Sequence, residues 1–444
     1  MIWSDYKNMN KPEVKYGDSS SLYDMVMDFN APFVINDVLA NKELINKVNS
    51  VKSNFGTCTN EQLEKSFFDE IPNLKNVDFL PLNRLNSPDE KKSIRDAFNT
   101  VLDIGQYTSG EYVGKFESYI SSFLRIKHVI GTSSGTAGLM IALKSLGVKC
   151  GDEVIIPSNS FAATENAVLA CGAIPVLADI NSDDYTIDPT DIEKKITNKT
   201  KVILPVHLYG KLANMKKIKE IADVHKVKIV EDACQAIGVT GVGLYSDLSV
   251  LSFNPFKNFG VCGKSGAILT NNDELGKMCR IVGYHGFDVG KKNFKTLDFG
   301  YNCRMDNIMA SIGVAKLPFL SLNNFKRCYL AKRYIENLKD LQECGKIILP
   351  EFTNDNSWHL FPIRVTGDRQ EIMSMMKKKG VETQVYYPVL THEQNTGLKS
   401  TYFKGVRLPV SEIVNQTILN IPLHHALTIQ EQNLVLEAIR DVIK

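Results

Sequence analysis

Two reactive side chains follow two β-branched runs of the chain, where buried strands would end. Asp232 stands just after the run Lys228 to Val230, and Lys257 stands five residues beyond Ser252, near the end of a second run. A carboxylate can hold a heterocyclic nitrogen in its protonated form, and a lysine amine can form a Schiff base with an aldehyde. Together the two groups are suited to hold and activate a heterocyclic aldehyde.

A third feature lies upstream, where the segment Thr132 to Thr136 separates a strand-like run from the apolar helical segment Ala137 to Leu146. The amides at a helix N-terminus, with the positive end of the helix dipole, favour a phosphate monoester. A phosphate cradle, an acid for a pyridine nitrogen and a lysine for an aldehyde are the requirements of one cofactor, pyridoxal 5′-phosphate (PLP). The sequence therefore predicts a PLP site.

Short β-branched runs alternate with amphipathic helical segments through the middle of the chain. The runs are His128 to Gly131, Val154 to Pro157, Pro175 to Ala178, Lys201 to Pro205, Lys228 to Val230, Leu248 to Phe253 and Ala267 to Thr270. This alternation predicts an α/β fold with a mainly parallel, seven-stranded sheet and helices on both faces. Ligands bind at the carboxyl ends of the strands in such sheets, which is where Asp232 and Lys257 stand.

Changes in polarity and in the spacing of apolar runs divide the chain into three parts. Residues 1–78 are polar and lack the recurring β-branched runs, so we interpret them as an N-terminal extension. Residues 79–320 hold the alternating runs and form the expected large, PLP-binding domain. The long helical region Ser321 to Gln342 opens a smaller C-terminal α/β domain, residues 321–444.

Composition excludes several other classes of protein. The 444 residues carry a formal net charge of only +2, which gives no reason to expect nucleic acid or a membrane as a partner. No apolar run approaches the ~20 residues that span a bilayer, and the first residues lack a signal-peptide pattern, so we expect a cytoplasmic protein. The nine cysteines include no C-x-x-C pair, which argues against a disulfide framework and a zinc site. No metal is expected.

The ordered motifs resemble the DegT/DnrJ/EryC1/StrS family of sugar aminotransferases, which have the aspartate aminotransferase fold (fold type I of PLP enzymes). Besides the segments above, the resemblance rests on Pro205 to Gly210, Gly300 to Asp306 and Tyr386-Tyr387-Pro388. It covers residues 79–444. It implies a transaminase that takes an amino group from an amino acid, with glutamate as the expected donor, and gives it to a keto sugar.

The resemblance also implies roles for individual residues. Lys257 would carry the cofactor as a Schiff base and then move a proton between the substrate and the cofactor. Asp232 would pair with the pyridinium nitrogen, Gln235 would lie beside the phenolic oxygen, and Phe161 would stack on the ring face.

The expected phosphate site uses side chains and amides from three places in the sequence. Ser134, Gly135, Thr136 and Ser252 would hold the phosphate, and Asn302 would reach it from a partner subunit. That last role requires a homodimer with shared active sites.

The acceptor is suggested by a closer likeness. The run Ser252 to Lys264 most resembles the branch of the family that aminates 3-oxo-glucose 6-phosphate to kanosamine 6-phosphate, in antibiotic biosynthesis. Relatives commonly have an acidic residue where Lys264 stands, and His-Tyr-Pro where this chain has Tyr386-Tyr387-Pro388. We hypothesise that Lys264 binds the sugar phosphate. The further candidates for substrate contact are His207, Tyr209, His285 and Tyr387.

Less specific interpretations stand beside these. A lysine after a strand is usually a solvated surface residue, an aspartate there often caps a helix, and His207 and His285 could equally be structural. A nucleotide-linked keto-deoxy sugar is an alternative acceptor, and a non-catalytic, PLP-binding regulatory protein is an alternative function. Sugar 3-dehydratases of the family have histidine in place of the Schiff-base lysine, so Lys257 argues against that branch.

Overall fold

The computed structural model of the protein describes residues 64–443 apart from 66, 73, 289, 292 and 354. Residues 1–63, most of the expected extension, lie outside this part. The first two helices of the main fold are α4 (Pro88–Ile104) and α5 (Glu111–Leu124). Helix α4 begins with a capping box, because Ser87 and Glu90 each accept the other's backbone amide.

Seven strands form the central sheet, in the order β1-β7-β6-β5-β4-β2-β3. They are β1 (His128–Thr132), β2 (Glu153–Pro157), β3 (Ile174–Ala178), β4 (Thr200–Ile203), β5 (Lys228–Asp232), β6 (Leu248–Ser252) and β7 (Gly266–Thr270). Strand β7 runs antiparallel to both β1 and β6, and the other neighbours are parallel. The predicted seven-stranded, mainly parallel sheet is confirmed.

Neighbouring residues of each strand enter different hydrophobic clusters, as the pleat of a strand requires. Ile229 packs with α8 and α9, whereas Val230 packs with α6 and α7 on the other face. Val250 and Leu251 of β6 divide in the same way between two clusters. Both faces of the sheet are therefore apolar, which explains the β-branched runs without polar alternation.

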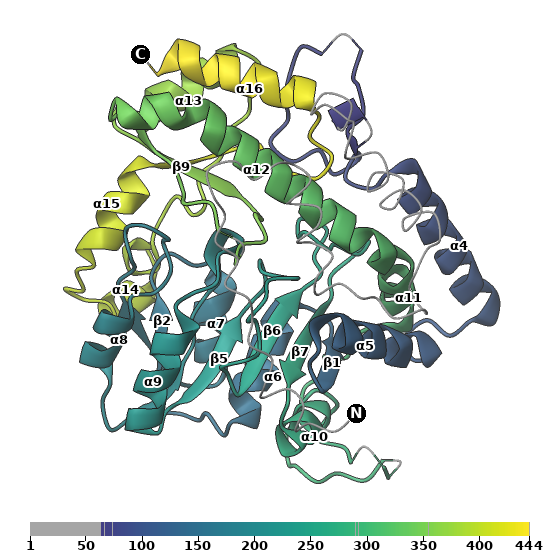
Figure 1. Cartoon of the computed structure of the whole chain (residues 1–444). Helices are drawn as coiled ribbons and strands as arrows, with labels where there is room; N and C mark the ends of the chain where they lie inside the picture. Colours follow the sequence, from purple (N-terminus) through teal and green to yellow (C-terminus); the bar gives the residue numbers. More distant parts are fainter. Residues whose placement is uncertain are drawn as a thin grey trace, which may run out of the picture.

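Helices cover both faces of this sheet (Figure 1). They are α6 (Gly135–Ser145), α7 (Ala162–Ala170), α8 (Pro189–Lys195), α9 (Met215–His225), α10 (Asp273–Val282) and α11 (Asn307–Lys316). Gly138 of α6 lies so close to β6 that an added Cβ would stand 2.7 Å from Val250. This close packing brings the start of α6 to the carboxyl end of β6.

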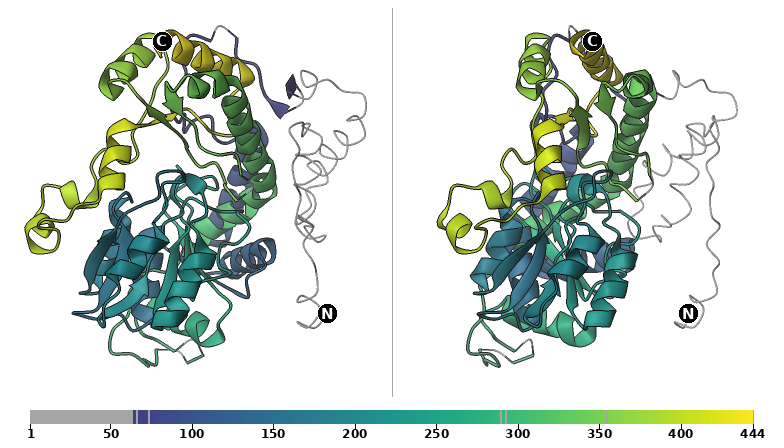
Figure 2. Two further views of the ribbon diagram at one scale, coloured as in Figure 1. Left: turned by 60° about the vertical axis from the view of Figure 1, so that its left-hand side comes forward. Right: turned by 90° about the vertical axis from the view of Figure 1, so that its left-hand side faces the viewer.

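A second, three-stranded sheet lies in the C-terminal part, in the order β10-β9-β8, with antiparallel neighbours. Its strands are β8 (Ile347–Ile348), β9 (Phe361–Val365) and β10 (Ile418–Ile421). The helices of this part are α12 (Leu320–Glu343), α13 (Arg369–Lys378), α14 (Gly397–Thr401), α15 (Pro409–Thr417) and α16 (Ile429–Val442). Figure 2 shows α12 running from the central sheet to this second layer. No helix among the described residues is long and apolar enough to span a membrane.

The residues just before the large domain pack against the C-terminal part of the same chain. Phe67 lies in its hydrophobic cluster, with its ring 5.3 Å from that of Phe325. The amide of Val77 donates to the carbonyl of Gly380 at 2.8 Å, and Val77 forms a parallel bridge with Val381. The last residues of the predicted extension are thus part of a folded core.

Candidate active site

Asp232 is the last residue of β5, and its side chain is buried at the carboxyl edge of the sheet. Its Oδ2 accepts a hydrogen bond from the Thr164 hydroxyl at 2.9 Å, and its Oδ1 accepts one from the Cys234 amide at 3.3 Å. These hydrogen bonds satisfy one lone pair of each oxygen of a buried carboxyl group and fix its position. The site therefore offers a fixed acceptor.

Lys257 lies in the loop between β6 and β7, where its amide donates to the carbonyl of Asn254 at 2.8 Å. Burial lowers the pKa of Lys257, and the nearby Cys234 and Asp232 oppose this effect only in part. A lowered pKa increases the fraction of free amine, the form that attacks an aldehyde and accepts a proton. Lys257 and Asp232 are thus brought together, as predicted from their strand-end positions.

The phosphate cradle is formed where the start of α6 meets the end of β6. Ser134 caps α6, because its hydroxyl accepts the Ala137 amide at 3.0 Å. An added Cβ at Gly135 would lie 2.8 Å from the Cys234 sulfur and 3.0 Å from Cβ of Ser252. The start of α6 therefore lies against Ser252 at the end of β6, and a helix N-terminus beside a hydroxyl suits a bound phosphate.

Gln235 joins two tyrosines beside this group. Its Oε1 accepts the Tyr209 amide at 2.7 Å, and its Nε2 donates to the Tyr387 hydroxyl at 3.3 Å. The ring of Tyr387 lies 5.7 Å from that of Phe161, which begins α7 with its side chain 59% exposed. Phe161 thus has an open face on which an aromatic ring can stack.

The other two buried candidates have their polar atoms satisfied inside the protein. His207 is fully buried, with Nε2 3.1 Å from the Glu231 carboxylate and Nδ1 accepting the Ala213 amide at 3.2 Å. It therefore has no free ring nitrogen for a substrate. The hydroxyl of Tyr209 donates to the carbonyl of Tyr386, so Tyr209 lies at the site but its hydroxyl is engaged.

The remaining candidates are exposed on loops. Lys264 lies in the turn before β7, beyond the loop that carries Lys257. His285 and Asn302 belong to the long loop between α10 and α11, where Tyr284 forms a β-bridge with Asn302. No contact within the described residues joins these two side chains to Lys257.

Several residues of the site were not anticipated from the sequence. They are Thr164, which holds Asp232; Cys234, which lies between Asp232 and Gly135; and the pair Asn258 and His359. The His359 ring bonds Asn258 Oδ1 at 2.9 Å, and burial, followed by the charge of Lys257, lowers the pKa of His359 well below its ordinary value. His359 is thus a neutral neighbour of the lysine. From the sequence, the only available signal was closeness to a predicted site residue: Cys234 lies near Asp232, and Asn258 follows Lys257.

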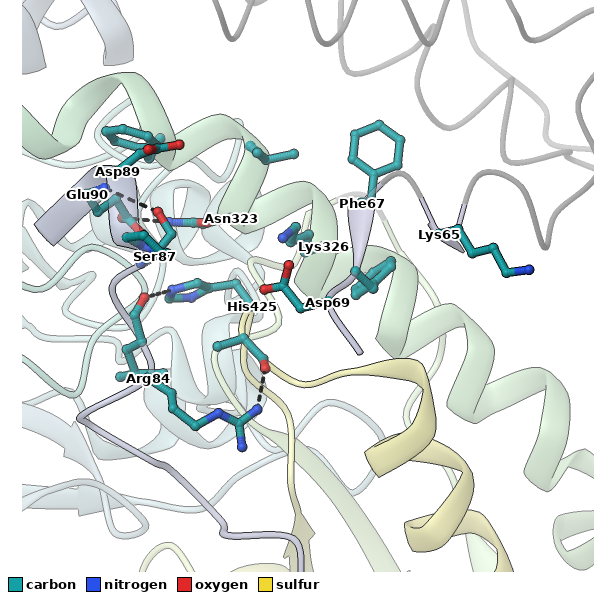
Figure 3. A pocket seen from close by; sticks show the side chains of 16 residues that line it. Lys65, Phe67, Asp69, Arg84, Ser87, Asp89, Glu90, Asn323, Lys326 and His425 are labelled. Carbon is teal, nitrogen blue, oxygen red and sulfur yellow. Dashed lines mark hydrogen bonds between the residues drawn. The ribbon is translucent and has the colours of Figure 1, made fainter. Parts of the chain in front are cut away.

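Two cavities lie near the start of α4. The smaller, of about 60 Å³, is lined by Lys257 and Lys316 among others. The larger, of about 260 Å³, opens between α4, α12 and the residues before the large domain (Figure 3). Glu90, Asn323 and His425 line both cavities, and Asn323 Nδ2 donates to Glu90 at 3.2 Å. Of the cofactor-binding candidates, Lys257 lines the smaller of these cavities and none lines the larger.

The assembled groups fit PLP: amides and a hydroxyl for a phosphate, Asp232 for a ring nitrogen and Lys257 for an aldehyde. No group of three potential metal ligands occurs among the described residues.

Comparison with known proteins agrees with this fit. The chain is 50% identical over 373 residues to a 3-oxo-glucose-6-phosphate:glutamate aminotransferase of Bacillus subtilis (strain 168), which spans 84% of this chain and 85% of the relative. It is 35% identical over 358 residues to a pleiotropic regulatory protein of Geobacillus stearothermophilus, 79% of this chain and 94% of the relative. The crystal structure of NtdA from Bacillus subtilis with bound cofactor PMP superposes with a TM-score of 0.85 at 47% identity, covering 90% of this chain and 92% of that one. The sequence model of the DegT/DnrJ/EryC1/StrS aminotransferase family matches residues 88–440, and the chain belongs to that family.

Proposed function

We propose that this PLP-dependent aminotransferase moves an amino group from glutamate to 3-oxo-glucose 6-phosphate and so forms kanosamine 6-phosphate. The convergence of Lys257, Asp232 and the Gly135 cradle carries the cofactor part of this proposal. The acceptor and donor are supported by the 50% identity to the relative of that name. The bound PLP supplies an aldehyde for the amine and a ring that withdraws electrons from the substrate carbon.

Each residue of the site has a task that follows from its contacts. Lys257, with its lowered pKa, would take a proton from the carbon of the amino donor and pass it to the cofactor. Asp232, held by the hydrogen bonds of Thr164 and Cys234, would pair with the ring nitrogen and keep a proton on it. Phe161 supports the ring face with its exposed side.

The phosphate of the cofactor is held by Ser134, Gly135, Thr136 and Ser252 at the start of α6. Asn302 is exposed on the long loop between α10 and α11, which suits a residue that reaches another subunit. We place the partner subunit's Asn302 against this phosphate, in a homodimer with shared sites.

The acceptor's own phosphate needs a cation, and exposed Lys264 is our candidate. His285 and Tyr387 are the remaining proposed sugar contacts. Residues 79–320 and 321–444 are proposed as the large and small domains, and the cytoplasm as the location, in a pathway of antibiotic biosynthesis.

The test uses the full chain reconstituted with PLP. Glutamate alone should remove the absorbance of the Schiff base between PLP and Lys257 and release 2-oxoglutarate. Addition of 3-oxo-glucose 6-phosphate should then restore this absorbance. Lys257→Ala is the control and should give neither change. Borohydride reduction followed by peptide mapping should find the cofactor on Lys257. An unchanged absorbance with glutamate would favour a regulatory, PLP-binding protein, and restoration only by a nucleotide-linked keto sugar would replace the proposed acceptor.

A further inference from the structure

The hydrogen bonds around Gln235 determine which way its amide group points. The buried Tyr209 amide is a donor, so the oxygen of Gln235 must face it, at 2.7 Å. The nitrogen then faces the Tyr387 hydroxyl at 3.3 Å and donates to it. Tyr209 itself is held at φ 60° by two further contacts, as His359 donates its amide to the Tyr209 carbonyl and the Tyr209 hydroxyl is bound to Tyr386. The direction of the Gln235 side chain is therefore fixed by the fold.

The Tyr387 hydroxyl accepts from Gln235, so its own proton is directed elsewhere. No acceptor among the described residues takes that proton. Burial, and after it the charge of Asp232, raises the pKa of Tyr387, so the hydroxyl keeps its proton at neutral pH. Tyr387 is thus a neutral donor with an unused hydrogen, held inside the site.

Its neighbours place this donor at the edge of the proposed cofactor ring. The Tyr387 ring lies against Phe161, the proposed support for the ring face, at 5.7 Å. Asp232, the proposed partner of the ring nitrogen, is close enough to act on Tyr387 electrostatically. Gln235 is the residue expected beside the phenolic oxygen, and this oxygen is the ring's ionisable acceptor.

We propose that Tyr387 is a cofactor-binding residue whose hydroxyl donates to the phenolic oxygen of the cofactor, and that Gln235 is the positioning residue that aims it. This inference rests on the proposed function, and it gives Tyr387 a contact with the cofactor in place of a contact with the sugar. The donor stabilises the ionised form of the oxygen, so the cofactor absorbance titrates at a lower pH than it would without Tyr387.

The test is a pH titration of the absorbance of the reconstituted holoenzyme without substrates. Tyr387→Phe should move the midpoint upward by about 0.5 to 1 pH unit, the effect of one hydrogen bond to an ionised group. Tyr386→Phe is the matched control: it removes a neighbouring hydroxyl that has no hydrogen-bond partner among the described residues, and it should leave the midpoint unchanged. A midpoint that Tyr387→Phe leaves in place, with only the apparent affinity for the sugar changed, overturns the proposal.

A second variant tests the role of Gln235. Gln235→Glu keeps an oxygen for the Tyr209 amide, but it replaces the donor to Tyr387 by an acceptor that draws the tyrosine proton away. The midpoint should rise at least as far as in Tyr387→Phe. The added carboxylate also shifts the midpoint through its charge, so the same change is made in the Tyr387→Phe background. An equal shift in the two backgrounds refutes the positioning role. Failure of the proposed function itself is separate, since it would appear as no cofactor on Lys257 or no 2-oxoglutarate from the unaltered chain.

Discussion

The Thr164 hydroxyl donates to Oδ2 of Asp232 at 2.9 Å, so a residue in the first turn of α7 holds a carboxylate at the end of β5. The two lie 68 positions apart in the sequence, and the parallel order of the sheet brings them together. The charge proposed to act on the cofactor ring is thereby held from a second element.

Asp232→Asn should reduce the rate of the glutamate half-reaction by about 10²-fold or more, because it removes the charge that keeps a proton on the ring nitrogen. Stopped-flow absorbance after addition of glutamate measures this rate. Thr164→Val should cost about tenfold, the effect of one lost hydrogen bond to a charged group. Equal losses in the two variants would contradict the separate roles of charge and support.

Gly135→Ala should weaken cofactor binding by about tenfold or more, since an added Cβ would lie 2.8 Å from the Cys234 sulfur and 3.0 Å from Cβ of Ser252. Equilibrium titration of the apoprotein with PLP measures the dissociation constant. Gly114→Ala is the control, because an added Cβ there meets nothing within 4 Å. If both variants bind PLP as well as the unaltered chain, the start of α6 does not hold the phosphate.

Lys264→Ala should raise the KM for 3-oxo-glucose 6-phosphate by about tenfold, since a phosphate loses one cation. The glutamate half-reaction should keep its rate, because Lys264 is exposed on the turn before β7 and makes no described contact with Asp232. Steady-state kinetics with varied acceptor give the KM. An unchanged KM would assign the sugar phosphate to another residue.

His424 should make the protein less stable in acid. Its ring is fully buried, and burial lowers its pKa to about 3. Between pH 6.5 and 3 the unfolded chain binds a proton that the folded chain does not, so the free energy of unfolding falls as the pH falls through this window, by up to about 1.4 kcal/mol per pH unit. His359 and His425, whose pKa values burial also lowers, act in the same direction.

Urea unfolding midpoints at several pH values between 7 and 4 measure this effect. His424→Gln should reduce the pH dependence of the free energy of unfolding by the contribution of about one bound proton. His225→Gln, at an exposed position of α9, should leave this pH dependence unchanged. A slope that is the same in both variants would show that His424 does not contribute.

Local patterns were sufficient for much of the fold. Helix α6 lies within two residues of the predicted segment Ala137 to Leu146 at each end, and Asp232 and Lys257 lie at and beyond their strand ends as expected. The antiparallel direction of β7 was not predicted, because an apolar run carries no information about strand direction. The contact between Gln235 and Tyr387 joins residues 152 positions apart, and it depends on how the C-terminal part meets the sheet. His207 shows the same limit, since only the fold reveals that both its nitrogens are engaged.

The bridge between Val77 and Val381 sets a limit on how far the chain can be shortened from its start. A chain that begins at residue 76 would keep this bridge but lose Phe67 and Phe68, which cover parts of Phe325 and Tyr329. Such an exposed apolar surface favours aggregation. A shortened protein for crystallisation should therefore retain the chain from Glu64 onward.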